Sequence, residues 1–116
     1  MRVLVLGAYG MLGHRLLLEL GRGEEAFGTC RSLAQDGTAA RLVPADMLVP
    51  GVDAARFESV AEAISSTRPD AVVNCIGIVK QLKEARDPVV SELVNSTFPH
   101  LLAGECARRG VRLVHF

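Results

Sequence analysis

Residues 2–13 read R-V-L-V-L-G-A-Y-G-M-L-G, and this stretch decides the fold class. Its first part, residues 2–6, is a nearly continuous β-branched and aliphatic run, typical of a strand buried on both faces of a parallel sheet. Glycines then recur at every third position, and Leu16 and Leu20 continue an apolar pattern at helical spacing until Gly21. The stretch therefore predicts a strand, a glycine turn and a helix in direct succession.

The same alternation of strands and helices continues along the chain. Asp53 is expected to cap a helix with an apolar stripe through Val60 and Ile64, and Gly110 to end a later helix. Alternating elements with right-handed crossovers favour an α/β fold, a Rossmann-like doubly wound parallel sheet with strand order 3-2-1-4-5. The further strands are expected at residues 26–30, 41–44, 71–75 and 111–116, and the later helices between Asp53 and Arg68 and between Pro88 and Arg109.

The extent of the chain suggests part of a larger sheet. No repeat, linker or low-complexity tract divides residues 1–116, so we expect one domain. The pattern stops at the fifth strand, whose outer edge would ordinarily gain a neighbour. We therefore expect the N-terminal part of a longer protein, truncated after strand five.

The composition excludes several classes of protein. Thirteen Lys and Arg residues balance 13 Asp and Glu residues, and Lys80 and Lys83 are the two lysines, so we expect no nucleic-acid partner. Three widely spaced cysteines form no C-x-x-C pair, which favours reduced thiols, a cytoplasmic location and no metal. No apolar run approaches the roughly 18 residues of a spanning helix, so no membrane is expected.

Each glycine of the turn has a physical role in binding a dinucleotide. Gly7 permits the tight turn, Gly10 lets the backbone approach a pyrophosphate, and Gly13 lets the helix pack closely on the sheet. The unpaired amides at the start of the following helix form an anion site. The alternative is a glycine turn in an unrelated sheet protein, but the placement between this strand and this helix favours nucleotide binding.

The choice of cofactor depends on residues about 20 positions beyond the glycine turn, where a carboxylate would bind the ribose 2′-hydroxyl of NAD. Here residues 30–32 read C-R-S. Because no carboxylate is present and the Arg31 guanidinium can bind a 2′-phosphate, the sequence favours NADP (NADPH), with NAD as the alternative. Arg31 is otherwise a solvent-exposed residue that follows the strand.

Four segments together resemble one enzyme family. They are G-A-Y-G-M-L-G at 7–13, P-A-D-M at 44–47, V-V-N-C-I-G at 72–77 and V-N-S-T-F-P-H-L-L-A at 94–103. The chain resembles the extended short-chain dehydrogenase/reductases, and within them the dTDP-4-dehydrorhamnose reductase branch with an RmlD-like domain. The resemblance spans the whole chain and implies an NADP-dependent oxidoreductase.

The resemblance also implies roles for individual residues. Asp46 and Met47 would border the adenine ring, and Asn74 through Gly77 would lie against the ribose and nicotinamide. Asn95 would have a supporting catalytic role, organising a water, on a helix that Pro99 is expected to kink. The alternatives are a turn cap for Asp46, a turn-forming Asn74 and a purely structural helix at Asn95. With Arg31, the expected cofactor contacts are Gly7, Tyr9, Gly10, Met11, Leu12, Gly13, Asp46, Met47, Asn74, Cys75, Ile76 and Gly77.

Catalysis in this family uses a Tyr-x-x-x-Lys pair, which this chain does not contain. Its one tyrosine is Tyr9, with Gly13 four residues later, so we expect no turnover from residues 1–116 alone. The resemblance implies that the intact protein reduces a nucleotide-activated keto-deoxy sugar for cell-surface polysaccharide synthesis. The alternatives are an NAD-dependent sugar-nucleotide epimerase or dehydratase, a non-catalytic NADP-binding regulator and an interaction domain. The open strand edge also predicts self-association.

Overall fold

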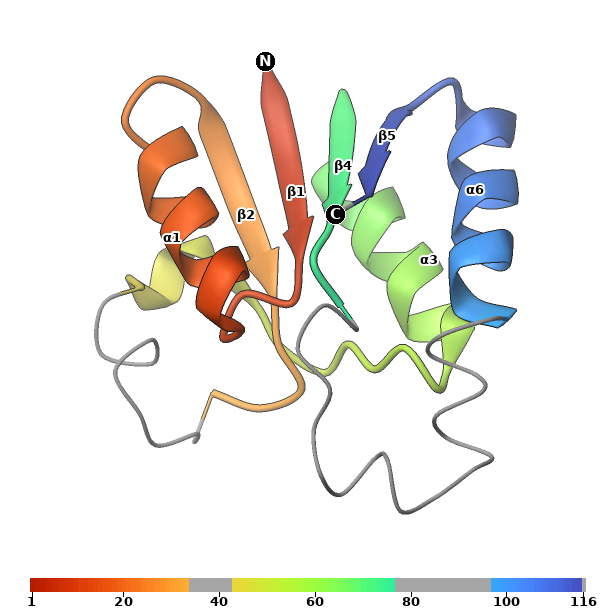
Figure 1. The fold of residues 1–116 in the computed structure, drawn as a ribbon, viewed down its shortest axis with the longest axis horizontal. Helices are drawn as coiled ribbons and strands as arrows, with labels where there is room; N and C mark the ends of the chain where they lie inside the picture. The colour runs from red at the N-terminus through yellow and green to blue at the C-terminus, as the bar shows by residue number, and fades with distance from the viewer. Residues whose placement is uncertain (34–42, 77–96, 116) are drawn as a thin grey trace.

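The computed structural model describes residues 1–33, 43–76 and 97–115, and these form a parallel sheet with helices on both faces (Figure 1). The strand order is β3-β2-β1-β4-β5, which confirms the predicted topology. Every neighbouring pair of strands is parallel. The elements are β1 (Arg2–Leu6), α1 (Met11–Leu20), β2 (Glu25–Thr29), a 3-10 helix η1 (Ala45–Met47), β3 (Leu48–Val49), α3 (Phe57–Thr67), β4 (Ala71–Asn74), α6 (Phe98–Arg109) and β5 (Arg112–His115).

Strand β1 is apolar from Val3 to Leu6 because both of its faces are covered there. Val3 and Val5 belong to the core cluster that contains Leu17 of α1. Leu4 and Leu6 belong to the opposite cluster, which α3 and α6 complete. Alternate side chains of a strand point to opposite faces, so a central strand covered on both sides needs apolar residues at every position.

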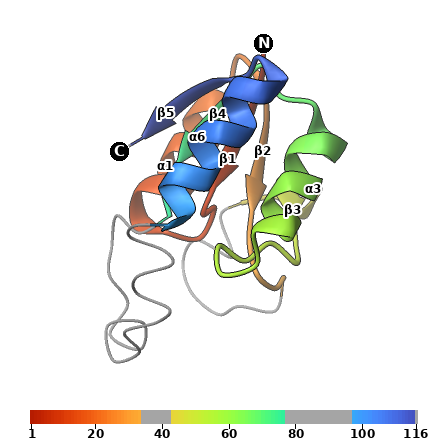
Figure 2. The ribbon, with the colours of Figure 1, turned by 90° about the vertical axis from the view of Figure 1, so that its right-hand side faces the viewer.

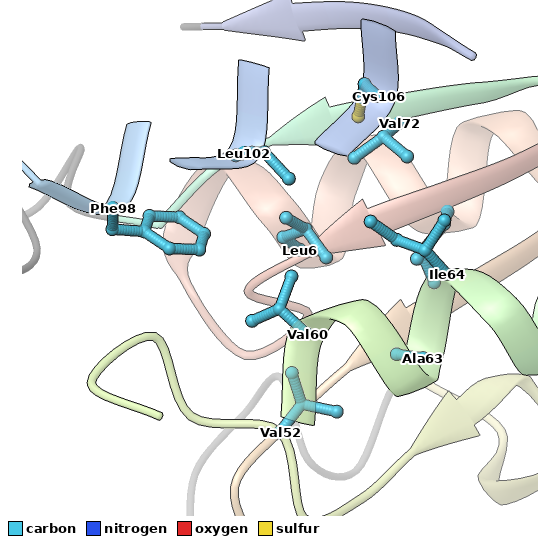
Figure 3. Close-up of a cluster of buried hydrophobic side chains, with 10 residues drawn as sticks. Leu6, Val52, Val60, Ala63, Ile64, Val72, Phe98, Leu102 and Cys106 are labelled. Carbon is cyan, nitrogen blue, oxygen red and sulfur yellow. The ribbon is translucent and has the colours of Figure 1, made fainter. Parts of the chain in front are cut away.

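Helices α3 and α6 lie side by side over one face of the sheet (Figures 1 and 2). The rings of Phe57 and Phe98 meet where the two helices begin, with their centroids 6.2 Å apart. Leu6 lies between residues of these two helices in the core (Figure 3). Burying each such large aliphatic or aromatic side chain contributes about 1.5–3 kcal/mol. The other members drawn in Figure 3 and labelled are Val52, Val60, Ala63, Ile64, Val72, Leu102 and Cys106.

The predicted third strand is wrong. We expected it at residues 41–44, whereas β3 is Leu48–Val49 and pairs with the end of β2. Residues 41 and 42 lie outside the described part of the chain, and Val43 is buried in the core without belonging to a strand. Pro44 has no amide hydrogen to donate, and its carbonyl accepts from the amide of Met47 at 3.0 Å. The strand follows this turn and begins at Leu48, seven residues after the expected start.

The predicted cap of α3 is also wrong. The helix begins at Phe57 and its N-cap is Arg56, not Asp53. The Asp53 carboxylate instead accepts from the amide of Ala55 at 2.9 Å, which closes a turn before the helix. The Asp53 side chain therefore accepts a hydrogen bond within this turn, three residues before the N-cap position, and does not cap the helix. The predicted stripe is confirmed for Val60 and Ile64, which are almost completely buried.

The last helix ends as predicted. Gly110 follows α6 in the left-handed conformation with φ of 68°, which favours glycine. Pro99 lies in the first turn of the described helix, where a proline is tolerated. The predicted part from residue 88 to 96, with the kink expected at Asn95, lies outside the described residues. None of the helices in the described ranges is long and apolar enough to cross a membrane.

Candidate functional site

The candidate site lies where the carboxyl ends of β1, β2 and β4 meet, at the lower edge of the sheet in Figure 1. The glycine turn follows β1 there and leads into α1. In parallel α/β sheets, ligands bind beyond this edge, at the point where the chain connections diverge to opposite sides. Here β1 has β2 on one side and β4 on the other, so the turn occupies that point.

The glycine turn is built around close backbone contacts. Gly7 has φ of 90°, a conformation that L side chains rarely adopt. A β-carbon at Gly13 would lie 1.9 Å from the carbonyl oxygen of Gly7, so the first turn of α1 packs directly on the loop. Both glycines are therefore required by the fold itself. This packing places the N-terminus of α1, which is the positive end of its dipole, at the carboxyl edge of the sheet.

Gly10 differs from these two glycines. It has φ of −70°, which any residue can adopt. Among the described residues, a β-carbon there would meet the Gly7 carbonyl oxygen alone, at an ordinary contact distance of 3.6 Å. Gly10 is exposed at the start of α1. Packing among the described residues therefore does not require a glycine at this position.

The turn is tied to the end of β2. The amide of Gly7 donates to Thr29 Oγ1 at 3.1 Å, and the amide of Ala8 donates to the Thr29 carbonyl at 2.8 Å. A β-carbon at Gly28 would lie 2.7 Å from that of Ala8 and 2.5 Å from Leu17 Cδ2. Gly28 therefore makes room for the turn and for α1, which explains a glycine inside a strand.

Tyr9 connects the turn to Cys30, the residue that follows β2. Burial raises the pKa of the Tyr9 hydroxyl, and its interaction with the Cys30 thiol, including a side-chain hydrogen bond, raises it further. Burial also raises the pKa of Cys30, which is itself buried. Both groups therefore stay protonated at neutral pH, so this pair supplies neither a nucleophile nor a base.

The end of β4 completes the site on the other side. The amide of Cys75 donates to the Leu6 carbonyl at 3.0 Å, which extends the β1–β4 pairing beyond Asn74. A β-carbon at Gly7 would lie 3.3 Å from Ile76 Cγ1, so Ile76 borders the turn. Burial raises the pKa of the Cys75 thiol to about 11, so this cysteine is not a nucleophile at neutral pH.

Arg31 and Ser32 are exposed at the same edge of the sheet. The Arg31 carbonyl accepts from the amide of Gly51 at 3.2 Å, and the Cys30 carbonyl accepts from the amide of Val52 at 3.1 Å. These bonds join the segments that follow β2 and β3. The predicted 2′-phosphate residue is thus beside the Tyr9–Cys30 contact and the glycine turn.

The structure does not bring Met47 to the glycine turn. The Met47 methyl group lies 2.8 Å from the position of a β-carbon at Gly21, beyond the carboxyl end of α1. The glycine turn is at the other end of this 10-residue helix, about 15 Å away at a rise of about 1.5 Å per residue. Asp46, beside Met47 in η1, is exposed. Leu12 is partly buried and packs against the core on the α1 face.

Sequence reasoning missed Asp53 as a candidate site residue. Once β3 is placed at Leu48–Val49, Asp53 becomes the first acidic residue beyond the carboxyl end of that strand. Its amide donates to Ser59 Oγ at 2.9 Å, which fixes the segment before α3. The signal in the sequence was Pro50-Gly51, a turn pair that places the strand end before it; Gly51 has φ of 77°.

Some predicted residues cannot be placed. Gly77 and Asn95 lie outside the described residues, and of Met11 the backbone alone is described. In the ranges 1–33, 43–76 and 97–115, no three His, Cys, Asp or Glu side chains gather in a way that could hold a metal ion.

Comparison with known proteins shows relatives along the whole chain. The sequence model of the family described as "RmlD substrate binding domain" matches residues 1–116. A curated protein from a Streptomyces species, 3-diazoavenalumate denitrifying reductase, is 35% identical over 85 residues, which are 72% of this chain and 26% of that protein. The chain therefore spans about a quarter of this relative's length.

Solved structures share the fold. UDP-glucose 4-epimerase of Thermus thermophilus, in complex with NAD, matches 97% of this chain and 36% of its own with a TM-score of 0.77 at 29% identity. A hypothetical dTDP-4-dehydrorhamnose reductase from Sulfolobus tokodaii matches 99% of this chain and 38% of its own with a TM-score of 0.76 at 20% identity. The chain corresponds to a little over a third of each structure.

Proposed function

Because the chain belongs to the family of the RmlD substrate binding domain, we propose that it is the dinucleotide-binding portion of an NADP-dependent sugar-nucleotide reductase. In this proposal residues 1–116 form one NAD(P)-binding domain. The intact protein reduces a nucleotide-activated keto-deoxy sugar in the cytoplasm, for the synthesis of a cell-surface polysaccharide.

The observation that carries the proposal is the contrast among the three glycines. Gly7 is required by its positive φ and Gly13 by its contact with the Gly7 carbonyl, whereas Gly10 is exposed and meets no close contact from the residues that the structure describes. A glycine that the fold does not need, at the start of α1 and at the carboxyl edge of the sheet, fits a backbone approached by a pyrophosphate. The residues present therefore fit a dinucleotide.

Several groups of this chain would hold the cofactor. The amides at the start of α1 bind the pyrophosphate, and Arg31 with Ser32 binds the 2′-phosphate of the adenosine ribose. Asn74, Cys75 and Ile76 position the segment that borders the nicotinamide side. A bound reduced nicotinamide supplies a hydride for a carbonyl carbon. The residues of this chain bind and orient it.

The chain does not contain the Tyr-x-x-x-Lys pair whose tyrosine would protonate the forming alkoxide. Tyr9 is its one tyrosine, and its raised pKa and contact with Cys30 belong to the cofactor side of the site. The residue four positions later is Gly13, so Tyr9 is not the tyrosine of a Tyr-x-x-x-Lys pair. We therefore propose that residues 1–116 bind the cofactor without turning over a keto sugar.

A second candidate function is an NAD-dependent sugar-nucleotide epimerase. It is favoured by the likeness to the Thermus thermophilus epimerase, which was solved with NAD. Against it stands the absence of a carboxylate at residues 30–32, where NAD-binding folds of this type place one. Relative affinity for NADPH and NADH separates the two functions.

We also propose that the chain associates with itself through the edge strand β5. Val114 is 39% exposed, and β5 is the outermost strand on its side of the described sheet. Sedimentation of residues 1–116 across a range of concentrations tests this, because a monomer at every concentration contradicts it.

The experiment that tests cofactor binding compares two glycine substitutions. Gly10→Ala leaves the fold's packing intact but adds a methyl group where the pyrophosphate approaches. Gly23→Ala is the matched control, because a β-carbon at Gly23 would meet no atom of the described residues within 4 Å. We expect Gly10→Ala to raise the Kd for NADPH by at least about tenfold, or about 1.4 kcal/mol, and Gly23→Ala to leave it unchanged. Equal affinities in the two variants would contradict the proposal.

A further inference from the structure

The side chain of Asn74 is buried and its orientation is determined by its neighbours. Asn74 is only 4% exposed. One end of its amide lies 3.0 Å from the backbone nitrogen of Ile76, which can only donate, so that end is the oxygen Oδ1. The other end is therefore the nitrogen Nδ2, and it faces Nδ1 of His115 at 3.2 Å.

This arrangement determines the tautomer of His115. An amide nitrogen donates hydrogen bonds and accepts none, so His115 Nδ1 must accept. The neutral imidazole then carries its proton on Nε2. The bond joins the two strands at a directly opposed pair, since Asn74 and His115 are register partners of β4 and β5.

The same amide controls the edge of the glycine turn. Asn74 Oδ1 holds the amide of Ile76, and the backbone between them is held on its other side by the Cys75–Leu6 bond of 3.0 Å. A β-carbon at Gly7 would lie 3.3 Å from Ile76 Cγ1 and 3.5 Å from the Ile76 nitrogen. The position of Ile76 therefore limits where the turn can lie.

We propose that His115 is a positioning residue for the dinucleotide site, which it controls through Asn74 and Ile76. The inference rests on the proposed function and assigns Asn74 a different part in it. Asn74 is only 4% exposed and each end of its amide has a partner within the protein, so in this proposal Asn74 orients the segment that borders the turn.

The test compares three variants of the 116-residue chain by NADPH titration at pH 8, where an ordinary imidazole is neutral. His115→Phe keeps a ring but removes the acceptor. His115→Asn restores an acceptor, because Asn Oδ1 is as many bonds from the backbone as His Nδ1. His100→Phe is the matched control, since His100 is an exposed histidine of α6.

We expect His115→Phe to raise the Kd for NADPH about three- to tenfold, the effect of one lost hydrogen bond on a positioned group. His115→Asn should stay within about twofold of the wild type, and His100→Phe should be unchanged. The inference is overturned if His115→Phe binds as tightly as the wild type. It is also overturned if His115→Asn binds as weakly as His115→Phe.

A measurement without ligand separates failure of this inference from failure of the proposed function. In the wild type, ¹⁵N NMR of the His115 ring should show Nε2 protonated and Nδ1 bare. The amide signals of Ile76 and Gly7 should move in His115→Phe and return in His115→Asn. If these signals behave as expected but the wild type does not bind NADPH or NADH, the coupling of His115 to Ile76 through Asn74 is supported and the proposed function fails. A proton on Nδ1, or amide signals that do not move, contradicts this coupling itself.

Discussion

A β-carbon at Gly13 would lie 1.9 Å from the carbonyl oxygen of Gly7, so the first helix and the turn before it are packed backbone against backbone. No rotamer change can relieve this contact, because the oxygen belongs to the main chain. Gly13→Ala must therefore move the turn or the start of α1. This contact fixes the start of α1 against the turn that follows β1, and the candidate site is built on that turn.

The first prediction follows for stability. Gly13→Ala should lower the free energy of unfolding by about 3 kcal/mol, the upper part of the usual range for overpacking. Gly10→Ala should cost about 1 kcal/mol, because alanine is a poorer N-cap than glycine but meets no close contact there. Urea unfolding followed by circular dichroism measures both. Equal losses in the two variants would show that the Gly7–Gly13 contact is not close in solution.

A second pair of glycines in and after α6 should give changes of opposite sign. Gly104 is exposed inside the helix, and a β-carbon there would meet nothing within 4 Å in the part of the chain that the structure describes. Gly104→Ala should therefore stabilise the protein by about 0.5–1 kcal/mol. Gly110 has φ of 68°, so Gly110→Ala should destabilise by about 1 kcal/mol. Thermal unfolding compares the two variants. A stabilising Gly110→Ala would mean that the helix does not end in the left-handed conformation.

The third prediction concerns alkaline pH and Cys75. Its thiol has a pKa of about 11 in the folded chain against an ordinary value of 9.0. Between these values the unfolded chain holds fewer protons than the folded one, so stability falls as pH rises from about 9 towards 11. Below pH 9 the thiol is protonated in both states, so its contribution to the free energy of unfolding is fully present. The fall should be shallower in Cys75→Ala, measured by urea unfolding at several pH values, and an identical fall would contradict the burial of this thiol.

The fourth prediction tests the choice of cofactor. Arg31→Ser removes the guanidinium that would bind a 2′-phosphate, so the Kd for NADPH should rise about tenfold while that for NADH stays unchanged. Arg22→Ser, an exposed arginine just after α1, is the control for loss of charge. Equal effects of Arg31→Ser on both cofactors would assign Arg31 a role other than recognition of the phosphate.

The elements that could be predicted from the sequence are those whose pattern reflects burial on a whole face. Strand β1 is apolar from Val3 to Leu6 because helices cover both sides, and Gly110 marks a helix end by its backbone conformation alone. The two-residue β3 carries too short a pattern, and Val43 is apolar because it fills the core, not because it belongs to a strand. Because the sequence pattern puts the end of the third strand at residue 44, it predicts Asp53 to be a helix cap and not a residue at the carboxyl edge of the sheet.

The glycine turn of the candidate site could be predicted from the sequence, but the side-chain contacts around it could not. Glycine spacing after a buried strand indicates the turn itself. The Asn74–His115 bond joins residues 41 positions apart and depends on the register of β4 and β5, which no local pattern reveals. The same holds for the contact of Tyr9 with Cys30, because it depends on how the turn packs against β2.

The most direct test of dinucleotide binding is an amide NMR titration of the ¹⁵N-labelled chain with NADPH and, separately, with NADH. We predict a dispersed spectrum whose changes centre on Gly7, Gly10, Gly13 and Arg31 and are stronger with NADPH. A dispersed spectrum that neither cofactor changes at millimolar concentration would contradict the account, because the chain would then fold without binding either dinucleotide.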